Sequence, residues 1–186
     1  MSDNNEPVIT IADLPLTFTV KYLGNHPARG LWGLKHTRKP VDNLVAQAKN
    51  LLKDQILPVV NVTISNNGFS FSPIGPSDKS HSSTINFSVE VISYGVQDLV
   101  YTRVFSMIIV ADESLKSDIP FICHSFVCDS KEQARKLTYA LAAVFKDYGR
   151  KVKEEAKATG KPLKRLAIDL RTPEEQAEQS DSETDA

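Results

Sequence analysis

The sequence predicts an α+β fold: a seven-stranded antiparallel β-sandwich or open barrel, capped by a C-terminal amphipathic helix, with an extra helix after the first strand. Three observations predict it. Short segments of alternating apolar and polar residues follow one another closely, as in a half-buried antiparallel sheet. The alternation changes parity between Glu90 and Ile92, which indicates a bulge or a switch between sheets, and hence a curved sheet. A long apolar stripe of helical period begins after Ser130.

The first strand and the helix after it come from the first quarter of the chain. Alternation starting near Phe18 predicts a strand that ends at Gly24. Residues 25–39 are expected to form a basic loop around the only tryptophan, Trp32. Pro40 suits the first turn of a helix, because no intrahelical hydrogen bond needs its missing N–H there. The apolar face of this helix comprises Leu44, Val45, Ala48, Leu51 and Leu52.

The middle of the chain predicts a hairpin followed by four more strands. Strands over 60–64 and 69–71 flank Asn66-Asn67-Gly68, and an Asn-Gly pair tolerates the positive backbone angles of a short hairpin turn. Residues 72–83, rich in serine and proline, are expected to form a surface loop. Further strands are expected over 85–91, 92–97, 104–110 and 121–128.

The last predicted element is a long helix. Ser130 and Gln133 have the spacing of a capping box, in which each side chain bonds a backbone N–H of the first turn. The helix becomes highly charged beyond Gly149 and is expected to continue to Thr159. Its apolar stripe comprises Ala134, Leu137, Leu141, Val144, Phe145 and Tyr148. Such a stripe can cap the open end of a small curved sheet.

Length and composition predict one domain with tails. A chain of 186 residues with 41% hydrophobic residues can bury a sizeable core. We expect a flexible N-terminal arm (1–13), the domain (14–158) and a charged, mostly disordered tail (159–186). The net charge of −1 gives no reason to expect a nucleic-acid partner.

The cysteines and the hydropathy pattern predict a cytoplasmic protein. Cys123 and Cys128 lie five residues apart in one predicted strand, so their side chains face opposite ways and cannot form a disulfide. This indicates a reducing compartment. The N-terminus does not resemble a signal peptide, and no apolar run approaches the roughly 20 residues that span a bilayer.

No pattern in the sequence predicts catalysis. We find no nucleophile paired with a base, no paired carboxylates and no phosphate-binding glycine loop. Cys123, His124 and Cys128 would suggest zinc, but one strand would place these ligands on both of its faces. Neither a metal nor another cofactor is therefore expected.

Residues 92–97 are expected to form an edge of the sheet. The segment is short, and Gly95 leaves part of it without a side chain. An edge strand offers unpaired backbone groups that can take up an extended peptide as an added strand. Gly95 is equally compatible with a simple bend, and Ser93 with an ordinary strand residue.

Five motifs follow one another between Leu14 and Val152: Val20-Lys21-Tyr22-Leu23-Gly24, Ile92-Ser93-Tyr94, Val104-Phe105, Cys123-His124-Ser125-Phe126-Val127-Cys128 and Ala143-Val144-Phe145. On these motifs the chain resembles the phosphotyrosine-binding (PTB, or phosphotyrosine interaction) domains. The order and spacing of its motifs are most similar to the Disabled, Numb and low-density-lipoprotein-receptor adaptor subgroup. The resemblance implies a pleckstrin-homology-like fold of two near-orthogonal sheets capped by the last helix.

The resemblance also implies a function: a cytoplasmic Asn-Pro-x-Tyr or Asn-Pro-x-Phe segment of a membrane receptor adds to the edge strand and lies against the last helix. Phe145 matches the helix aromatic that packs on the peptide, although its stripe position equally fits a core residue. Only Arg103 lies near the expected strands, so we expect binding without phosphorylation. The predicted peptide site comprises Ile92, Ser93, Tyr94, Gly95, Val96, Leu141, Val144, Phe145 and Tyr148.

A group of basic residues suggests a second site, for a phosphoinositide headgroup, as the resemblance also implies. The same residues can equally form an ordinary solvated face. In the alternative function, the domain is a phosphoinositide-binding or scaffolding module of the same fold whose peptide groove is unused. In either function, lipid contacts would place this cytoplasmic protein at the inner face of the plasma membrane. The predicted lipid site comprises Lys21, Lys35, Arg38, Lys39, Lys49, Lys53 and Arg103.

Overall fold

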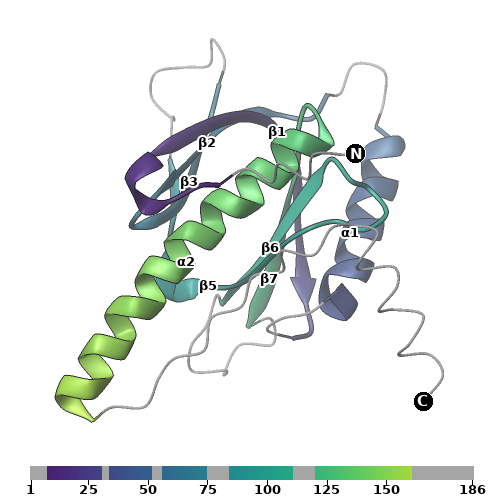
Figure 1. Cartoon of the computed structure of the whole chain (residues 1–186). Coiled ribbons are helices and arrows are strands. Elements are labelled where there is room, and N and C mark those ends of the chain that lie inside the picture. Colours follow the sequence, from purple (N-terminus) through teal and green to yellow (C-terminus); the bar gives the residue numbers. More distant parts are fainter. Residues whose placement is uncertain (1–7, 31–33, 52–55, 75–83, 111–119, 161–186) are drawn as a thin grey trace, which may run out of the picture.

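A computed structural model describes residues 8–30, 34–51, 56–74, 84–110 and 120–160. They form one antiparallel sheet of seven strands in the order β4-β3-β2-β1-β7-β6-β5, with two long helices (Figure 1). This confirms the predicted fold class. The strands are β1 (Leu16–Ala28), β2 (Val59–Ser65), β3 (Gly68–Pro73), β4 (Ile85–Ser88), β5 (Ile92–Gln97), β6 (Val104–Val110) and β7 (Phe121–Val127); the helices are η1 (Ile11–Asp13), α1 (Leu34–Lys49), η2 (Val89–Val91) and α2 (Lys131–Thr159).

The parity change near Glu90 marks the point where the chain crosses the sheet. The short 3-10 helix η2 separates β4 from β5, and these two strands lie at opposite ends of the strand order. The predicted irregularity is present, but it joins the two ends of one continuous seven-stranded sheet and is not a switch between two separate sheets. A second irregularity lies just beyond it, because the register of β5 against β6 shifts between Ile92 and Tyr94.

Strand β1 is longer than predicted: it continues past Gly24 to Ala28. Gly24 has a φ of +134° and sits at a register shift in the pairing with β7, so it forms a bulge inside the strand. The prediction was wrong because a glycine in a strand sequence can mark either a bulge or an end. Pro27 fits the extension, since beyond Lys21 the paired neighbour of β1 is β7 and not β2.

Helix α1 begins at Leu34, so Pro40 lies inside the helix and the prediction that Pro40 opens it was wrong. An internal proline removes one helix hydrogen bond and is costly. Burial offsets this cost, because Val41 and Leu44 pack with Leu23 of β1 in a cluster beneath the helix. The helix ends at Lys49, whereas the predicted apolar face ran on to Leu51, which is 38% exposed, and Leu52, which lies outside the described residues.

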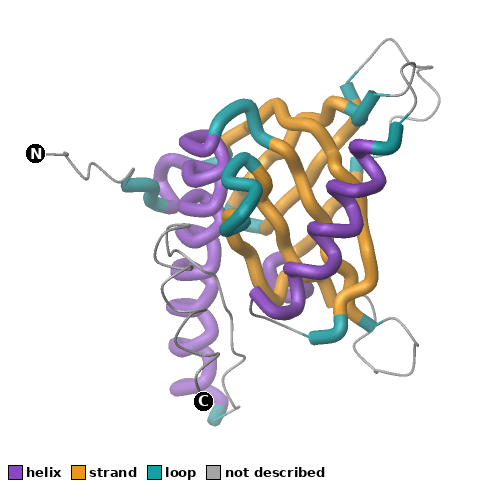
Figure 2. The backbone as a smooth tube through the Cα atoms, turned by 90° about the vertical axis from the view of Figure 1, so that its right-hand side faces the viewer, coloured by secondary structure: helices purple, strands orange, loops and turns teal. Residues whose placement is uncertain are grey.

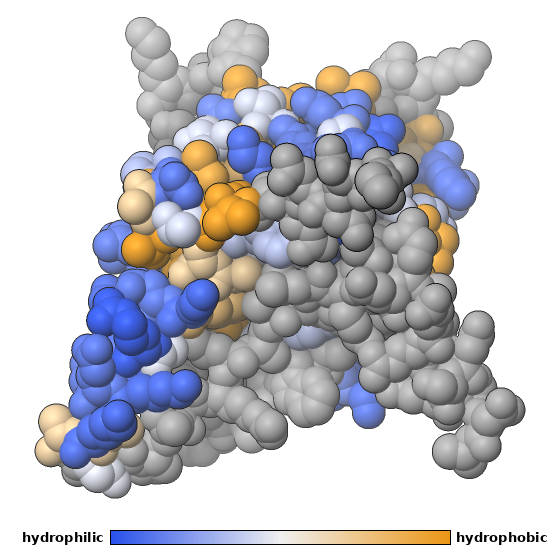
Figure 3. All heavy atoms as spheres, viewed as in Figure 1, coloured by the Kyte–Doolittle hydropathy of each residue, from blue (hydrophilic) through white to orange (hydrophobic). Residues whose placement is uncertain are grey.

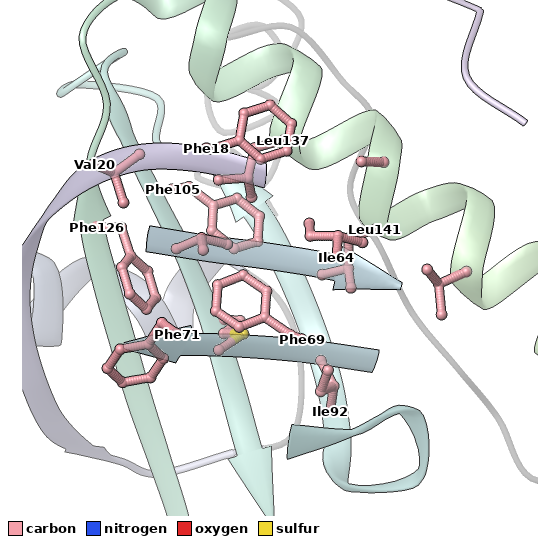
Figure 4. Packing of buried hydrophobic residues seen from close by; sticks show 14 of the residues in the cluster. Phe18, Val20, Ile64, Phe69, Phe71, Ile92, Phe105, Phe126, Leu137 and Leu141 are labelled. Atoms are coloured by element: carbon pink, nitrogen blue, oxygen red, sulfur yellow. The ribbon is translucent and has the colours of Figure 1, made fainter. Parts of the chain in front are cut away.

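The main core lies between α2 and one face of the sheet (Figure 4). Leu137 and Leu141 of α2 meet a group of strand phenylalanines, and burial of each such side chain contributes roughly 1.5–3 kcal/mol. Ile9, in the described part of the predicted arm, packs against the same core. Figure 2 shows that α1 lies across the strands on another side of the sheet from α2.

Helix α2 is capped at both ends. The Ser130 hydroxyl accepts a hydrogen bond from Gln133 N at 3.1 Å, as predicted, whereas the Gln133 side chain accepts from Asp129 N, one residue before the expected partner. Gly160, with a φ of +71°, ends the helix. The last turns of α2 present a hydrophilic surface (Figure 3).

Candidate functional site

Strand β5 is the last strand of the sheet, and β6 is its neighbour. Helix α2 contacts both strands, and Ile92 at the start of β5 belongs to the same core as Leu141 and Phe145 of α2. The predicted edge and the predicted helix surface therefore lie side by side, as Figure 1 also shows.

The hydrogen bonding of β5 shows which backbone groups face outward. Asp98 N donates to Val104 O at 2.8 Å, and the register from there back to Gly95 and Met107 contains no shift. Successive residues of an antiparallel strand direct their N–H and C=O groups to alternate sides. Val96 therefore pairs with β6, and the N–H and C=O of Gly95 point away from the sheet.

The side chains of β5 are core residues. Ile92 faces α2, whereas Tyr94 and Val96 pack with a cluster on the other side of the sheet. The register shift between Ile92 and Tyr94 accounts for this change of face. The Ser93 hydroxyl donates to Ile108 O at 3.1 Å, so it is engaged within the sheet. Apart from Ser93, every residue of β5 is buried, including Gly95, so the strand offers no exposed apolar side chain.

The predicted helix residues are also deeply placed. Leu141 and Val144 are fully buried, and Phe145 is 5% exposed. Tyr148, one turn further, is half-buried and packs at the margin of the core. Burial raises the pKa of Tyr148, and so does a side-chain hydrogen bond with Glu90. That bond joins α2 to η2 at the start of β5.

The structure does not bring the predicted basic residues together at one place. Lys35 and Lys49 are fourteen positions apart on α1, which separates them by about 21 Å along the helix. Arg38 forms ion pairs with Asp42 at 2.7 Å and with Asp98 at 3.1 Å, so internal carboxylates balance its charge. Lys39 is exposed on α1, and Lys53 lies outside the described residues.

Lys49 and Arg103 both line a pocket of about 390 Å³ that sequence reasoning did not find. Its lining includes apolar residues of α1, β6 and β7 and Leu57 before β2. Lys21 pairs in register with Val127, one of the lining residues. The only sequence signal was the apolar face of α1, because the other walls come from strands far apart in the chain.

Two buried thiols and a buried histidine lie within and just after β7. Burial raises the pKa of Cys123 to about 11 and that of Cys128 to about 12, and both cysteines are free. Burial lowers the pKa of His124 to about 4. At neutral pH the thiols are therefore protonated and the imidazole is neutral, so these groups serve packing and supply no reactive nucleophile.

Among the residues that the structure describes, no three His, Cys, Asp or Glu side chains are grouped so as to hold a metal ion. Nor does any helix among the same residues combine the length and apolar character needed to cross a membrane. The geometry that remains is an outward-facing strand edge beside a helix, together with an apolar pocket lined by two cations.

Comparison with known proteins agrees with this geometry. Residues 17–170 match a family described as phosphotyrosine interaction domain (PTB/PID). A similar solved structure is the solution structure of the C-terminal phosphotyrosine interaction domain of APBB2 from mouse. It has 21% sequence identity and a TM-score of 0.50, and the match covers 77% of this chain and 93% of that chain, which shows a shared fold. No curated protein matches this chain.

Domains of this family are non-catalytic modules that bind peptide motifs of other proteins. The family match spans most of the sequence, including β1, the β5 edge and α2. The chain belongs to the PTB/PID family.

Proposed function

We propose that this domain is an adaptor that binds Asn-Pro-x-Tyr or Asn-Pro-x-Phe segments in the cytoplasmic tails of membrane receptors. The observation that carries the proposal is the outward N–H and C=O of Gly95 on the last strand of the sheet, beside α2. An extended peptide that adds as a strand pairs with these groups, and the missing side chain lets its backbone approach closely.

The proposed binding surface consists of Ile92 to Val96 and the facing side of α2. Backbone pairing supplies affinity that does not depend on peptide sequence. Tyr148 is the most accessible of the predicted helix residues, since Leu141, Val144 and Phe145 are buried. The Asn-Pro turn after the paired segment would place the peptide Tyr near Ile92, where Glu90 and Tyr148 lie.

Binding is proposed not to require phosphorylation. A phosphate group is held best by clustered arginines that make charge-assisted hydrogen bonds. Arg103 Nε instead donates to Cys128 O at 3.0 Å, and its side chain lines the pocket beside α1. At the start of β5 the described charge near Tyr148 is the carboxylate of Glu90, which would repel a phosphate.

A second candidate function is binding of a phosphoinositide headgroup, favoured by the placement of Lys49 and Arg103 at one pocket with Lys21 nearby. Each basic side chain near an anionic membrane contributes about 1 kcal/mol. The two functions are compatible, because the pocket lies by α1 and the peptide edge by α2. A module that uses only the lipid site remains the alternative.

The test is a titration of the protein with an Asn-Pro-x-Tyr peptide, unphosphorylated and phosphorylated, followed by backbone amide NMR. We expect amide shifts in 92–96 and 142–148, with the unphosphorylated peptide binding at least as tightly. The control peptide carries Ala-Ala in place of Asn-Pro. Absence of shifts at millimolar peptide would refute the peptide site, and binding of the phosphopeptide alone would refute independence of phosphate.

A further inference from the structure

The turn between β5 and β6 displays an apolar side chain at its tip. Val100 is 61% exposed, although it is flanked by Leu99 and Tyr101, which are partly buried. Isolated exposed aliphatic residues are common on protein surfaces and need no special explanation. Val100 differs from such a residue in two ways: hydrogen bonds fix its turn, and other exposed apolar and basic side chains lie in or next to the segments that line the neighbouring pocket.

The turn is fixed by a buried carboxylate. Asp98 is 1% exposed, and its side chain accepts hydrogen bonds from Val100 N at 2.9 Å and Tyr101 N at 2.8 Å. Arg38 of α1 forms an ion pair with the same carboxylate at 3.1 Å. From the other side, the Gln97 amide donates to Thr102 O at 2.7 Å. Val100 therefore projects from a rigid tip.

Two other exposed apolar side chains belong to the same neighbourhood. Ile56 is 83% exposed and directly precedes Leu57, a residue of the pocket wall. Leu51 is 38% exposed and follows Lys49, another lining residue, by two positions. Val100 directly precedes Tyr101, which also lines the pocket, and Figure 1 shows this turn passing beside α1.

Basic side chains accompany these apolar ones. Lys49 and Arg103 line the pocket, and Lys21 is exposed on β1 opposite Val127 of the pocket wall. Protein–protein interfaces favour aromatic residues and arginine but are depleted in lysine, and this face carries two lysines and one arginine. Aliphatic side chains interspersed with lysine and arginine are typical instead of surfaces that lie in the interfacial layer of anionic membranes.

We propose that this face docks onto the surface of an anionic lipid bilayer, with the Val100 and Ile56 side chains entering the boundary between headgroups and acyl chains. Lys49 and Arg103 then lie at the level of the anionic headgroups. The proposal deepens the lipid-binding candidate above: it names a bilayer surface, and not a free headgroup, as the partner. It does not depend on peptide binding, since the pocket lies by α1 and the proposed peptide edge by α2.

Co-sedimentation of the full chain with vesicles tests the docking face. The vesicles contain phosphatidylcholine alone or with phosphatidylserine, and no phosphoinositide. We expect binding only to the anionic vesicles, weakened roughly three- to tenfold by Val100→Ser or Ile56→Ser, since each change removes one inserted aliphatic group. Ile85→Ser is the matched control, because Ile85 is 42% exposed on β4, at the opposite end of the strand order from β5.

A second measurement reports insertion directly. Val100→Trp and Ile85→Trp are each mixed with anionic vesicles whose acyl chains carry bromine, which quenches tryptophan fluorescence at short range. Trp32 is common to both variants, so any difference between them belongs to the new side chain. We expect additional quenching in Val100→Trp alone. Equal quenching in both variants would overturn the docking face.

The remaining outcomes separate the two lipid hypotheses. If the protein binds a soluble inositol phosphate but not phosphatidylserine vesicles, headgroup recognition stands and the docking face is overturned. If it binds the vesicles in a manner sensitive to Val100→Ser but binds no inositol phosphate, the docking face stands and specific headgroup binding fails. Equal losses in Val100→Ser and Ile85→Ser would also overturn the proposed face.

Discussion

Arg38 Nη1 lies 3.1 Å from both carboxylate oxygens of Asp98, whose side chain is almost completely buried. This pair ties α1 to the turn after β5. Removing Arg38 leaves a buried carboxylate without its counter-charge, which is costly. We therefore expect Arg38→Leu to lower the free energy of unfolding by about 2 kcal/mol, below the figure for fully buried pairs because Arg38 is 30% exposed. Urea unfolding of the wild type and of Arg38→Leu measures this loss.

Arg150→Leu provides the matched control for this prediction. Arg150 also forms two ion pairs, with Asp147 and Glu154, but its side chain is 62% exposed. Pairs of this kind contribute at most about 1 kcal/mol. Equal losses for Arg38→Leu and Arg150→Leu would show that the Asp98 pair does not fasten the turn.

His124 should make stability depend on pH. Its pKa is about 4 in the folded protein, because burial disfavours the imidazolium, and near 6.5 in the unfolded chain. The stabilisation is present above pH 6.5, because both states are then neutral, and is lost as the pH falls toward 4, because the unfolded chain binds the proton first. Between pH 7 and pH 5 we expect a loss of about 2 kcal/mol.

Urea unfolding of the wild type and of His124→Gln at both pH values measures this difference. The variant should lack this part of the pH dependence. His36→Gln is the control, since the His36 ring is less deeply buried and its pKa is lowered by burial and by the charge of Lys35. If wild type and His124→Gln lose the same stability on acidification, other groups carry the effect.

Phe145 should behave as a core residue in the free protein. Because the Phe145 side chain is only 5% exposed, Phe145→Ala is expected to lower the free energy of unfolding by about 3–5 kcal/mol, through lost apolar burial and the cavity left behind. Tyr148→Ala, at a half-buried position, should cost clearly less. Thermal unfolding compares the two variants. A loss below about 1 kcal/mol for Phe145→Ala would mean that the ring faces a groove and not the core.

The sequence was a good guide wherever one periodicity held over many residues. The stripe of α2 predicted its core positions, because every helical turn places one residue toward the sheet. The change of parity near Glu90 predicted the crossing between β4 and β5, because a change of face needs an irregular residue.

It was a poor guide where tertiary burial outweighed a local preference. Gly24 suggested the end of the first strand, yet β1 continues through Gly24 to Ala28. Pro40 suggested the start of a helix, yet α1 begins six residues earlier, at Leu34. Contacts with β7 and beneath α1 offset those local costs. The pocket by Lys49 could not be predicted for the same reason, since its walls meet only in the folded sheet.

The proposed site was predictable in its location but not in its chemistry. The short segment with Gly95 indicated an edge strand at Ile92 to Gln97, and the apolar stripe after Ser130 indicated a helix to pack on it; both are present. Which backbone groups face outward depends on the hydrogen bond between Asp98 and Val104, and the burial of Phe145 depends on packing around it. Neither can be read from residue order.

The central claim is that a peptide pairs with the outward backbone groups of Gly95. Gly95→Pro removes the N–H that would donate to an added strand and leaves the pairing of β5 with β6, since proline is tolerated at an edge whose N–H faces outward. Asn86→Pro is the matched control at the other end of the sheet. There Val89 N donates to Asn67 O at 3.1 Å, so by alternation Asn86 N–H also faces outward.

The decisive measurement is the affinity of the unphosphorylated Asn-Pro-x-Tyr peptide for these two variants, each checked by amide NMR to be folded. We expect Gly95→Pro to weaken binding by about tenfold or more, through the lost hydrogen bond and the obstructing ring, while Asn86→Pro binds as the wild type does. Unchanged affinity of a folded Gly95→Pro variant would contradict peptide addition to β5.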